Sequence, residues 1–252
     1  MCDSSVLVKF QGISLSQMDG VTLMNRTDRK YWFHQSWLEE LLEEVSQDYY
    51  LLEVEGERNL IYTTTYYDTQ ENEMFQNHHR GKMNRYKIRR RNYVATQSSF
   101  LEVKFKSNKG RTIKTRHPSD YCSKSFDLRD RDFISKNSPY SGLELHKVLE
   151  NRFRRLMLVS KSMDERCTID SEIRFRDGGN NVRLNDIVVV EVKTNGRSPS
   201  KIIDALNRRR LKPSGFSKYC VGRSLVDGDL KQNNFKRKHR DIERKTYNSI
   251  TI

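Results

Sequence analysis

The chain has 252 residues, of which 47 are Lys or Arg and 33 are Asp or Glu, so its formal charge is +14. The length suits one large domain or two small ones, and 12 Tyr and 11 Phe supply bulky groups for a core. No run of 18 apolar residues occurs and the first ten residues lack an apolar signal segment, so we expect neither a membrane span nor a secretion signal. The charge calls for an anionic partner: nucleic acid, an anionic membrane or a polyanionic small molecule.

Strand patterns dominate the N-terminal half. Residues 36–46 are expected to form a helix, because Leu38, Leu41, Leu42 and Val45 fall at helical spacing. A short helix is expected over residues 70–78. Strands are expected over residues 25–33, 60–68, 85–94, 100–106 and 111–117, the last two flanking a Ser-Asn-Lys-Gly turn.

The C-terminal half continues this pattern as far as a basic tail. Helices are expected over residues 142–151 and 200–211, and strands over residues 152–159, 165–176, 185–194 and 217–225. The predicted fold class is α+β, mainly antiparallel β: a closed, tunnel-like barrel of approximately eight strands with a few peripheral helices. Residues 1–230 are expected to form one domain, and residues 231–252 a basic, weakly periodic tail more typical of a mobile segment than of core.

Four cysteines are spread along the chain without a CxxC pair. They are Cys2, Cys122, Cys167 and Cys220. Widely separated cysteines of this kind predict free thiols in a reducing compartment and favour neither a disulfide framework nor a zinc site. We therefore expect a cytoplasmic protein, and its charge also fits a peripheral position at an anionic membrane.

Charged residues alternate with apolar ones along most of the predicted strands. Because side chains alternate faces, residues 85, 87, 89 and 91 place four cations on one face, and residues 166, 168, 170, 172, 174 and 176 form another polar face. A solvated outer face is the usual reading of such a strand. However, the pattern recurs on at least five strands and the helices are few. This favours a barrel whose cationic faces line the interior, which an anion with many negative charges would fill.

Carboxylates lie among these cations. Glu102, Asp170, Glu172 and Glu191 stand on the charged faces, and Glu191 lies in an otherwise apolar strand. A nucleic-acid surface tends to exclude acidic groups, whereas a phosphate site with a divalent cation needs a few as oxygen ligands. Simple pairing of each acid with neighbouring Arg and Lys is the alternative reading.

Nine segments in order along residues 24–225 resemble the triphosphate tunnel metalloenzymes, and among them the catalytic domain of the vacuolar transporter chaperone (VTC) type, a polyphosphate polymerase. The segments are RTDRKYW from Arg26, YYDT from Tyr66, KIRRRNY from Lys87, LEVK from Leu101, KTR from Lys114, RFRR from Arg152, RCTID from Arg166, EVK from Glu191 and FSKY from Phe216. Single motifs such as ExK are weak, and the ordered set is what carries the resemblance.

The resemblance implies a set of phosphate-binding catalytic cations: Lys30, Arg89, Arg91, Lys104, Lys114, Arg155, Arg166 and Lys218. Within this set, Arg89, Arg91, Lys104 and Lys218 are implied to hold the nucleotide. Two neighbours of Arg155 at positions 152 and 154 compete with it for the same place in the motif.

The resemblance also implies that Glu191 binds Mn²⁺ or Mg²⁺, with Glu102 as a second carboxylate. The implied reaction transfers the γ-phosphoryl group of ATP to a growing inorganic polyphosphate chain, and a membrane or membrane-protein partner would receive the polymer. Hydrolases of the superfamily open with an ExExK strand, where this chain has Arg26, Asp28 and Lys30. That departure fits the polymerases better, and a terminal phosphate nucleophile, already ionised, requires no general base.

Three alternatives stay open. The first is a tunnel triphosphatase that hydrolyses inorganic or nucleoside triphosphate, which needs a carboxylate to activate water. The second is a non-catalytic module that binds polyphosphate without turnover. The third is a nucleic-acid-binding barrel, which is disfavoured because the basic strand faces lack interleaved aromatic residues for base stacking.

Overall fold

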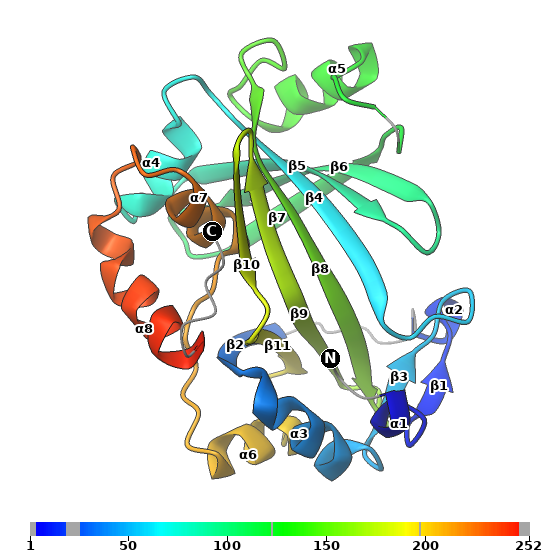
Figure 1. Ribbon diagram of the computed structural model, residues 1–252. Coiled ribbons are helices and arrows are strands. Elements are labelled where there is room, and N and C mark those ends of the chain that lie inside the picture. Colours follow the sequence, from blue (N-terminus) through cyan, green and yellow to red (C-terminus); the bar gives the residue numbers. More distant parts are fainter. Residues whose placement is uncertain (1–3, 19–25, 122, 197, 247–252) are drawn as a thin grey trace.

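Strands dominate the computed structural model, which describes residues 4–18, 26–121, 123–196 and 198–246 (Figure 1). Eleven strands of this described part form one sheet. Their bounds are β1 (Gln11–Ile13), β2 (Arg26–His34), β3 (Tyr49–Leu52), β4 (Leu60–Asp68), β5 (Arg85–Tyr93), β6 (Ser98–Lys106), β7 (Thr112–Pro118), β8 (His146–Ser160), β9 (Glu165–Asp177), β10 (Asn180–Leu184) and β11 (Ile187–Asn195).

Helices connect and cover these strands. Their bounds are α1 (Ser4–Leu7), α2 (Leu15–Met18), α3 (Leu38–Val45), α4 (Glu73–His79), α5 (Leu128–Asn137), α6 (Lys201–Arg208), α7 (Lys218–Val226) and α8 (Lys236–Thr246), with short 3₁₀ turns η1 (Gln35–Trp37) and η2 (Asn233–Phe235). Within the described residues, none of these helices has the length and apolar character needed to cross a bilayer.

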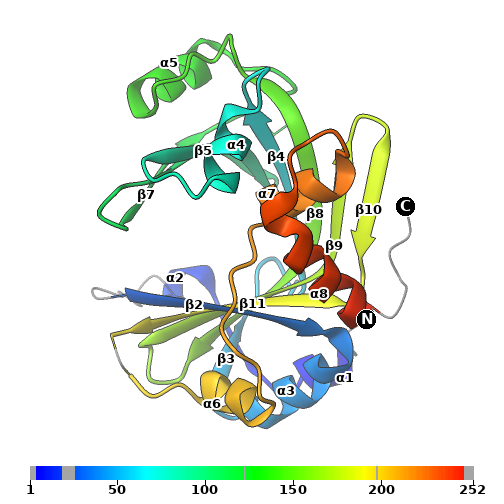
Figure 2. The same cartoon turned by 90° about the vertical axis from the view of Figure 1, so that its left-hand side faces the viewer.

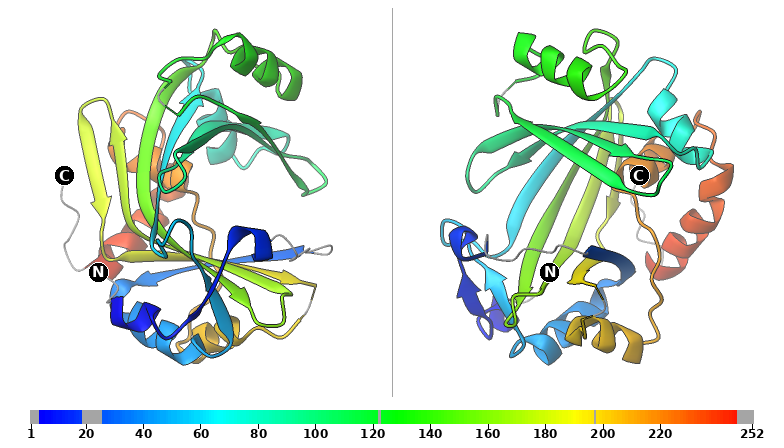
Figure 3. Two further views of the ribbon diagram at one scale, coloured as in Figure 1. Left: turned by 90° about the vertical axis from the view of Figure 1, so that its right-hand side faces the viewer. Right: turned by 180° about the vertical axis from the view of Figure 1, so that it is seen from behind.

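The sheet follows one continuous path of eight strands, in the order β2-β11-β9-β8-β4-β5-β6-β7. Neighbours on this path are antiparallel, which confirms the predicted α+β, mainly antiparallel class. Figure 3 shows that the path curls, so that β5, β6 and β7 lie across from β2 and β11. Within the described residues, no backbone hydrogen-bond ladder joins the end strands β2 and β7. The barrel, which the sequence predicts to be closed, is therefore open between these two strands.

Apolar residues on the outer side of β2, β9 and β11 are covered by helices α1, α3 and α6. Val188, Val190 and Val192 are fully buried there, against Leu41 and Leu206 among others. Helix α6 begins where the Ser200 hydroxyl accepts a hydrogen bond from the backbone N–H of Ile203. The alternation of the sequence therefore separates an apolar outer side from a charged inner side, as the pattern predicts.

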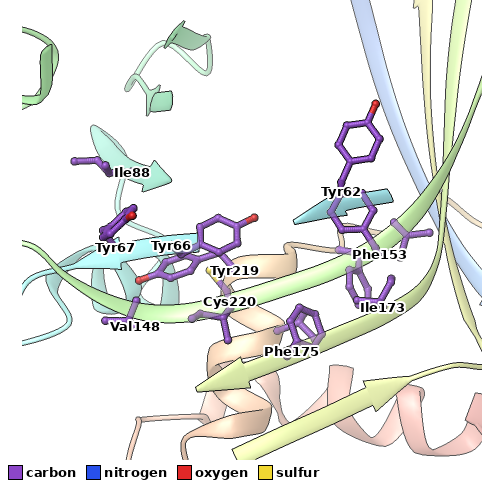
Figure 4. Close-up of a cluster of buried hydrophobic side chains, with 14 of the residues drawn as sticks. Tyr62, Tyr66, Tyr67, Ile88, Val148, Phe153, Ile173, Phe175, Tyr219 and Cys220 are labelled. Carbon is purple, nitrogen blue, oxygen red and sulfur yellow. The ribbon is translucent and has the colours of Figure 1, made fainter. Parts of the chain in front are cut away.

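Helix α7 lies on the other, inner side, against the ends of β8 and β9. Figure 4 shows Tyr219 and Cys220 of α7 in one buried cluster with Tyr66 and Phe175. A Cβ added at Gly222 would lie 2.5 Å from the ring of Phe175, so only glycine allows this close approach of helix to sheet.

Two predicted elements are wrong in type. The helix expected over residues 142–151 is instead the start of β8, a 15-residue strand whose residues pair with β4 and β9 along its length. The strand expected over residues 217–225 is α7, which starts where the Ser217 hydroxyl accepts from the backbone N–H of Cys220. Both segments mix β-formers and helix-formers, and tertiary pairing decided between them.

The basic tail contains a helix that its weak periodicity does not predict. Within α8, Ile242 is fully buried and Lys238 donates to the backbone carbonyl of Gly215 at 2.7 Å. Helix α5, with its buried Ile134, was also not predicted. Cys167 and Cys220 are buried free thiols. Cys2, Cys122, residue 25 of the first predicted strand and the tail beyond residue 246 lie outside the described residues.

Candidate active site

Glu102 forms the first of three ion-pair groups on the inner face of the sheet. Its carboxylate, on β6, is 1% exposed and accepts from Arg89 Nε of β5 at 2.7 Å and from Lys114 Nζ of β7 at 3.2 Å. Burial alone would raise the pKa of Glu102, but Arg89, Arg91 and Lys114 outweigh it and lower the pKa to about 2. The group holds three strands in register through residues that the sequence assigns to the site.

Asp170 forms the second group. It lies on β9 and accepts from Arg155 Nε at 2.6 Å and from Arg155 Nη2 at 2.8 Å, a bidentate pair, while Lys218 of α7 donates to its second oxygen. These two cations lower the pKa of Asp170 well below its usual range, against the effect of burial. Burial lowers the pKa of Lys218 to about 8, and the attraction of Asp170 offsets only part of this effect.

Glu191 and Lys30 form the third group, across neighbouring strands β11 and β2. Lys30 Nζ lies 2.6 Å from Glu191 Oε1, and the two residues are direct register partners. Burial of Glu191 would raise its pKa, but Lys30 and Lys193 lower it to about 2. Glu191 therefore stays ionised at neutral pH in the otherwise valine-rich strand that marked it in the sequence.

Lys104 shows that the two ends of the sheet approach each other. It lies on β6, which is six strand spacings along the path from β2, or about 29 Å if the sheet were flat. Partial burial and the charges of Lys87, Arg89 and Lys30 lower the pKa of Lys104 to about 8, and the charge of Glu191 opposes part of this shift. Charges screened over a Debye length of about 8–10 Å can act on each other only if the sheet curls and brings them together.

The remaining predicted cations lie on the same face. Arg91 Nε donates to Thr64 Oγ1 of β4 at 3.4 Å, and burial lowers the pKa of Arg91, with the charge of Arg89 adding to the effect. Arg166 lies further along, beside Lys193 in register, and donates to the backbone carbonyl of Met18 at 2.7 Å. All ten predicted site residues therefore share the inner face, and seven of them form the three ion-pair groups.

The structure decides among the three arginines that compete in the RFRR segment. Arg155 points inward to Asp170, whereas Arg154 pairs with Glu172 on the outer face at 3.3 Å. Arg152 lies on that outer face too, because its register partner on β4 is Thr63 and not one of the inward residues.

The predicted polar face of β9 is correct only for its first half. The β8–β9 register shifts between Arg152 and Arg154, and Glu172 on β9 has φ +49°, as a bulge requires. Beyond the bulge the faces exchange, so Ile173 and Phe175 are buried inside while Arg174 and Arg176 point outward. A one-residue insertion inverts strand alternation, and the alternation alone carries no signal for it.

Aromatic rings lie beneath the inner cations, which the sequence reading missed. The guanidinium carbon of Arg155 lies 5.0 Å from the ring centroid of Tyr62 and 5.1 Å from that of Phe153, and Lys218 Nζ lies 4.6 Å from Phe153. Figure 4 shows Tyr62 and Phe153 side by side. The sequence could have indicated Phe153, because it lies two residues before Arg155 on the same strand, but it could not have indicated Tyr62, which comes from another strand. Asp170 could also be recognised from the sequence as a residue of the charged face, because it alternates along the strand with Arg166.

The protein offers only a few ligands to a divalent cation at this site. Within the described residues, no three His, Cys, Asp or Glu side chains gather closely enough to enclose a metal. Mg²⁺ in phosphate sites is usually held by one or two carboxylates and by oxygens of the substrate. Glu191 meets this requirement, because its second oxygen is not the one paired with Lys30. Glu102 is less suited, since it bridges two cations and is almost fully buried.

Solved structures with some similarity to this chain are known. HpAC1 of Hippeastrum, a protein named as an adenylyl cyclase and described as having a dominant triphosphatase activity, is 16% identical with a TM-score of 0.51, covering 82% of this chain and 98% of its own. A protein of Bacillus halodurans named as an adenylate cyclase is 12% identical with a TM-score of 0.47, covering 77% of this chain and 96% of its own.

No curated protein matches the sequence. The family model described as the VTC domain matches residues 25–226, which is four fifths of the chain and includes every strand of the eight-strand path. The same region contains the three ion-pair groups. The chain therefore belongs to the VTC-domain family and has the fold of the triphosphate tunnel metalloenzymes.

Proposed function

We propose that this chain is a polyphosphate polymerase, which transfers the γ-phosphoryl group of ATP to the end of an inorganic polyphosphate chain and releases ADP. The observation that carries the proposal is the convergence of cations from β2, β5, β6, β7, β8 and α7 on one inner face, where Lys30 and Glu191 act on Lys104. Such a face, dense in Arg and Lys, matches a linear substrate that carries negative charge on every unit.

The chemistry proposed here needs positioning and charge neutralisation more than proton transfer. A terminal oxygen of the polyphosphate forms a bond to the γ-phosphorus, while the bond between that phosphorus and the β–γ bridging oxygen breaks. The electron pair of the broken bond leaves on the β-phosphate of ADP. Arg89, Arg91 and Arg155 would clamp phosphoryl oxygens as forks, and Lys30, Lys104 and Lys218 would act as point charges, as phosphoryl transfer requires.

The state of the inner carboxylates supports transfer over hydrolysis. Glu102, Asp170 and Glu191 each pair with one or two cations, which lower the pKa of each carboxyl group well below its usual range. A carboxylate with so low a pKa is a weak base at neutral pH and activates water poorly. A terminal phosphate nucleophile, in contrast, is already ionised.

Glu191 is the residue that would hold Mn²⁺ or Mg²⁺ together with substrate oxygens. When bound, the cation would neutralise charge on the transferring phosphoryl group. The role of Lys30 would be to keep Glu191 ionised and oriented.

Tunnel triphosphatase activity is the second candidate. It is favoured by the structural similarity to HpAC1, whose description gives a dominant triphosphatase activity. In that case the same cations would bind triphosphate, and the acceptor would be water.

The deciding experiment incubates the chain with ATP, Mn²⁺ and a short polyphosphate primer, and resolves the products on a gel. Growth of the chains with matching ADP release is the result expected. Orthophosphate without chain growth would establish the hydrolase instead, and tight polyphosphate binding without any turnover would reduce the protein to a binding module.

A matched pair of variants ties the activity to the inner face. Arg89→Ala with Arg91→Ala should lower the rate about a thousandfold or more, the range in which a phosphoryl-binding arginine acts. Arg240→Ala with Arg244→Ala removes the same charge from exposed positions of α8 and should keep the rate within about twofold. Equal rates in the two double variants would contradict the assignment.

The proposal places this activity in the cytoplasm, where ATP is available and where the free thiols of Cys167 and Cys220 would stay reduced. A membrane protein that receives the polymer belongs to the same proposal. Co-sedimentation of the chain with membranes, compared with and without ATP, tests it.

A further inference from the structure

Three arginines stand in one lateral row on the outer face of the sheet. Arg152 of β8 is the register partner of Arg174 of β9, which is in turn the register partner of Arg183 of β10. Residues directly opposite each other on antiparallel strands share a face, and Ile173 and Phe175 occupy the other face in the core. The three guanidinium groups therefore extend from the same side of three neighbouring strands.

These arginines have no partner among the described residues: no hydrogen bond or ion pair involves the side chain of Arg152, Arg174 or Arg183. The arginine next along β8 differs, because Arg154 is held by Glu172 and by the carbonyl of Asn59. Like charges placed directly opposite each other destabilise a sheet. A bound anion would remove that repulsion.

The row continues across two further strands with polar side chains. Arg152 is the register partner of Thr63 on β4, and Thr63 is the partner of Asn92 on β5. With neighbouring strands about 4.8 Å apart, five residues span four spacings, or about 19 Å. The row contains no carboxylate.

The row is also open to an approaching molecule. Arg152 and Arg183 are exposed and Arg174 is partly exposed. Figures 2 and 3 show β10 at the outer rim of the molecule, and no described helix lies beyond it on that side. Helix α7 contacts the same three strands from the inner face.

We propose that this arginine row binds linear inorganic polyphosphate on the outside of the sheet, as a second site separate from the inner face. Arg forks match phosphate oxygens, and a continuous lateral row matches a flexible linear polyanion that can follow the curve of the sheet. On one side of the row Arg154 is paired with Glu172, and on the other side Arg176 is the register partner of Glu150, so acidic groups offset the flanking arginines and the unpaired positive charge is concentrated in the row.

Nucleic acid fits the row less well than polyphosphate does, because none of its five residues is aromatic and none can stack on a base. The inference deepens the proposed function, since the ligand of the row is the product of the proposed reaction. A polymerase with such a row would keep hold of long chains between additions, while short chains would gain nothing from it.

The test compares the full chain with the triple variant Arg152→Gln, Arg174→Gln, Arg183→Gln. The probes are polyphosphate of about one hundred units and tripolyphosphate. Affinity for the long chain should fall about tenfold or more, and the slope of log affinity against log salt should fall by about 2, as for three phosphate contacts on a single strand. Affinity for tripolyphosphate and the rate of ATP turnover should stay within about twofold.

A second triple variant controls for net charge. Lys236→Gln, Arg237→Gln and Arg240→Gln remove the same charge from exposed positions of α8 and should leave long-chain binding intact. Equal losses in both triple variants would overturn the proposal, as would unchanged long-chain binding in the row variant. Loss of binding to anionic phospholipid vesicles or to single-stranded DNA, with polyphosphate binding kept, would also overturn it.

Two further measurements separate the causes of failure. The triple Arg→Lys variant at the same positions retains the charge but not the forks, and should lose less affinity than the Gln variant. Binding is measured without ATP, so a chain that proves to be a hydrolase still tests the row. Absent chain growth with intact row binding would refute only the proposed function.

Discussion

At the scale of single residues, the inner face combines cations of two kinds. Burial would lower the pKa values of Arg89 and Arg155, but Tyr66 and Glu102 beside Arg89 and Asp170 beside Arg155 outweigh it and raise them, so both stay charged at every pH of interest. Lys104 and Lys218 have pKa values of about 8, mainly because burial disfavours the charged form of each ammonium group. Part of the positive charge of the site therefore depends on pH close to neutrality.

Binding of tripolyphosphate should weaken as pH rises from 7 to 9. Lys104 carries its charge below its pKa of about 8 and loses it above, so at pH 9 only about a tenth of the free protein holds that proton. Calorimetric titration at pH 7, 8 and 9 checks this. Lys104→Arg keeps its charge throughout and should lessen the fall by up to about tenfold, whereas Lys136→Arg on exposed α5 should follow the parent chain. An identical pH profile in all three proteins would contradict the role of Lys104.

Replacement of Glu191 by glutamine should separate metal use from nucleotide binding. We expect metal-dependent turnover to fall about a hundredfold, because the amide is a poor ligand for a hard cation. ATP binding without metal should persist, since the phosphate-binding cations remain. Steady-state rates over a range of Mn²⁺ concentrations and ATP calorimetry measure the two effects. Glu44→Gln, on the outer surface beside Arg209, is the matched control.

At the scale of elements, α7 links the core to the site. Its first residue is Lys218, and its next residue, Tyr219, donates to the buried carboxylate of Asp68, which also caps α4 through the backbone N–H groups of Met74 and Phe75. Burial and the negative charge of Asp68 raise the pKa of Tyr219 well above its usual value. The position of Lys218 therefore depends on how closely α7 packs on the sheet.

Gly222→Ala should disturb that packing. The added Cβ would lie 2.5 Å from Phe175 and 2.8 Å from Leu149, so the helix must shift, at a cost of about 1–3 kcal/mol in the free energy of unfolding. The rate should fall as well, because Lys218 moves with the helix. Gly228→Ala, where nothing lies within 4 Å of the added atom, is the control for urea unfolding. Equal stability of the two variants would show that α7 is less closely packed than described.

Helix α5 is attached to the outer face of the sheet by one buried ion pair. Arg90 Nη2 of β5 lies 2.6 Å from Asp130 Oδ2, and both side chains are at least 96% buried. Asp130→Ala leaves the guanidinium uncompensated and should cost about 3–5 kcal/mol of unfolding free energy. Asp132→Ala, exposed on the same helix, should cost less than about 0.5 kcal/mol. Urea unfolding of both variants measures the difference, and a small loss for Asp130→Ala would argue against this anchor.

At the scale of the whole molecule, curling of the sheet decides which residues meet. In the sequence, the basic strand faces lack interleaved aromatic residues, which by itself disfavours a nucleic-acid role. The fold places Tyr62, Tyr66 and Phe153 beneath Arg155, Arg89 and Lys218, and each ring comes from a different element than its cation. Aromatic rings are therefore present on the inner face, and the carboxylates there are the better reason against nucleic acid.

Removal of the residues after Leu230 should lower stability more than activity. Helix α8 buries Ile242, and Lys238 and Lys245 lie over the ring of Trp32, but none of these residues reaches the three ion-pair groups. A loss of about 2–4 kcal/mol in unfolding free energy follows from the lost burial. Turnover at low temperature should stay within about threefold of the full chain. Lost activity in a truncation that remains folded by circular dichroism would show that α8 supports the site.

The sequence by itself determined most of the strand faces, the mainly antiparallel class and, through the ordered motifs, ten residues that lie on the inner face, because alternation and ordered motifs are local properties of a chain. Only the tertiary structure decided that residues 146–160 form one strand and 218–226 a helix, since both segments carry mixed propensities and packing resolved them. It also decided which arginine of RFRR faces inward and where Arg174 points. A bulge in β9 inverts the faces there, and its position depends on the partner strand and not on the residues that form it.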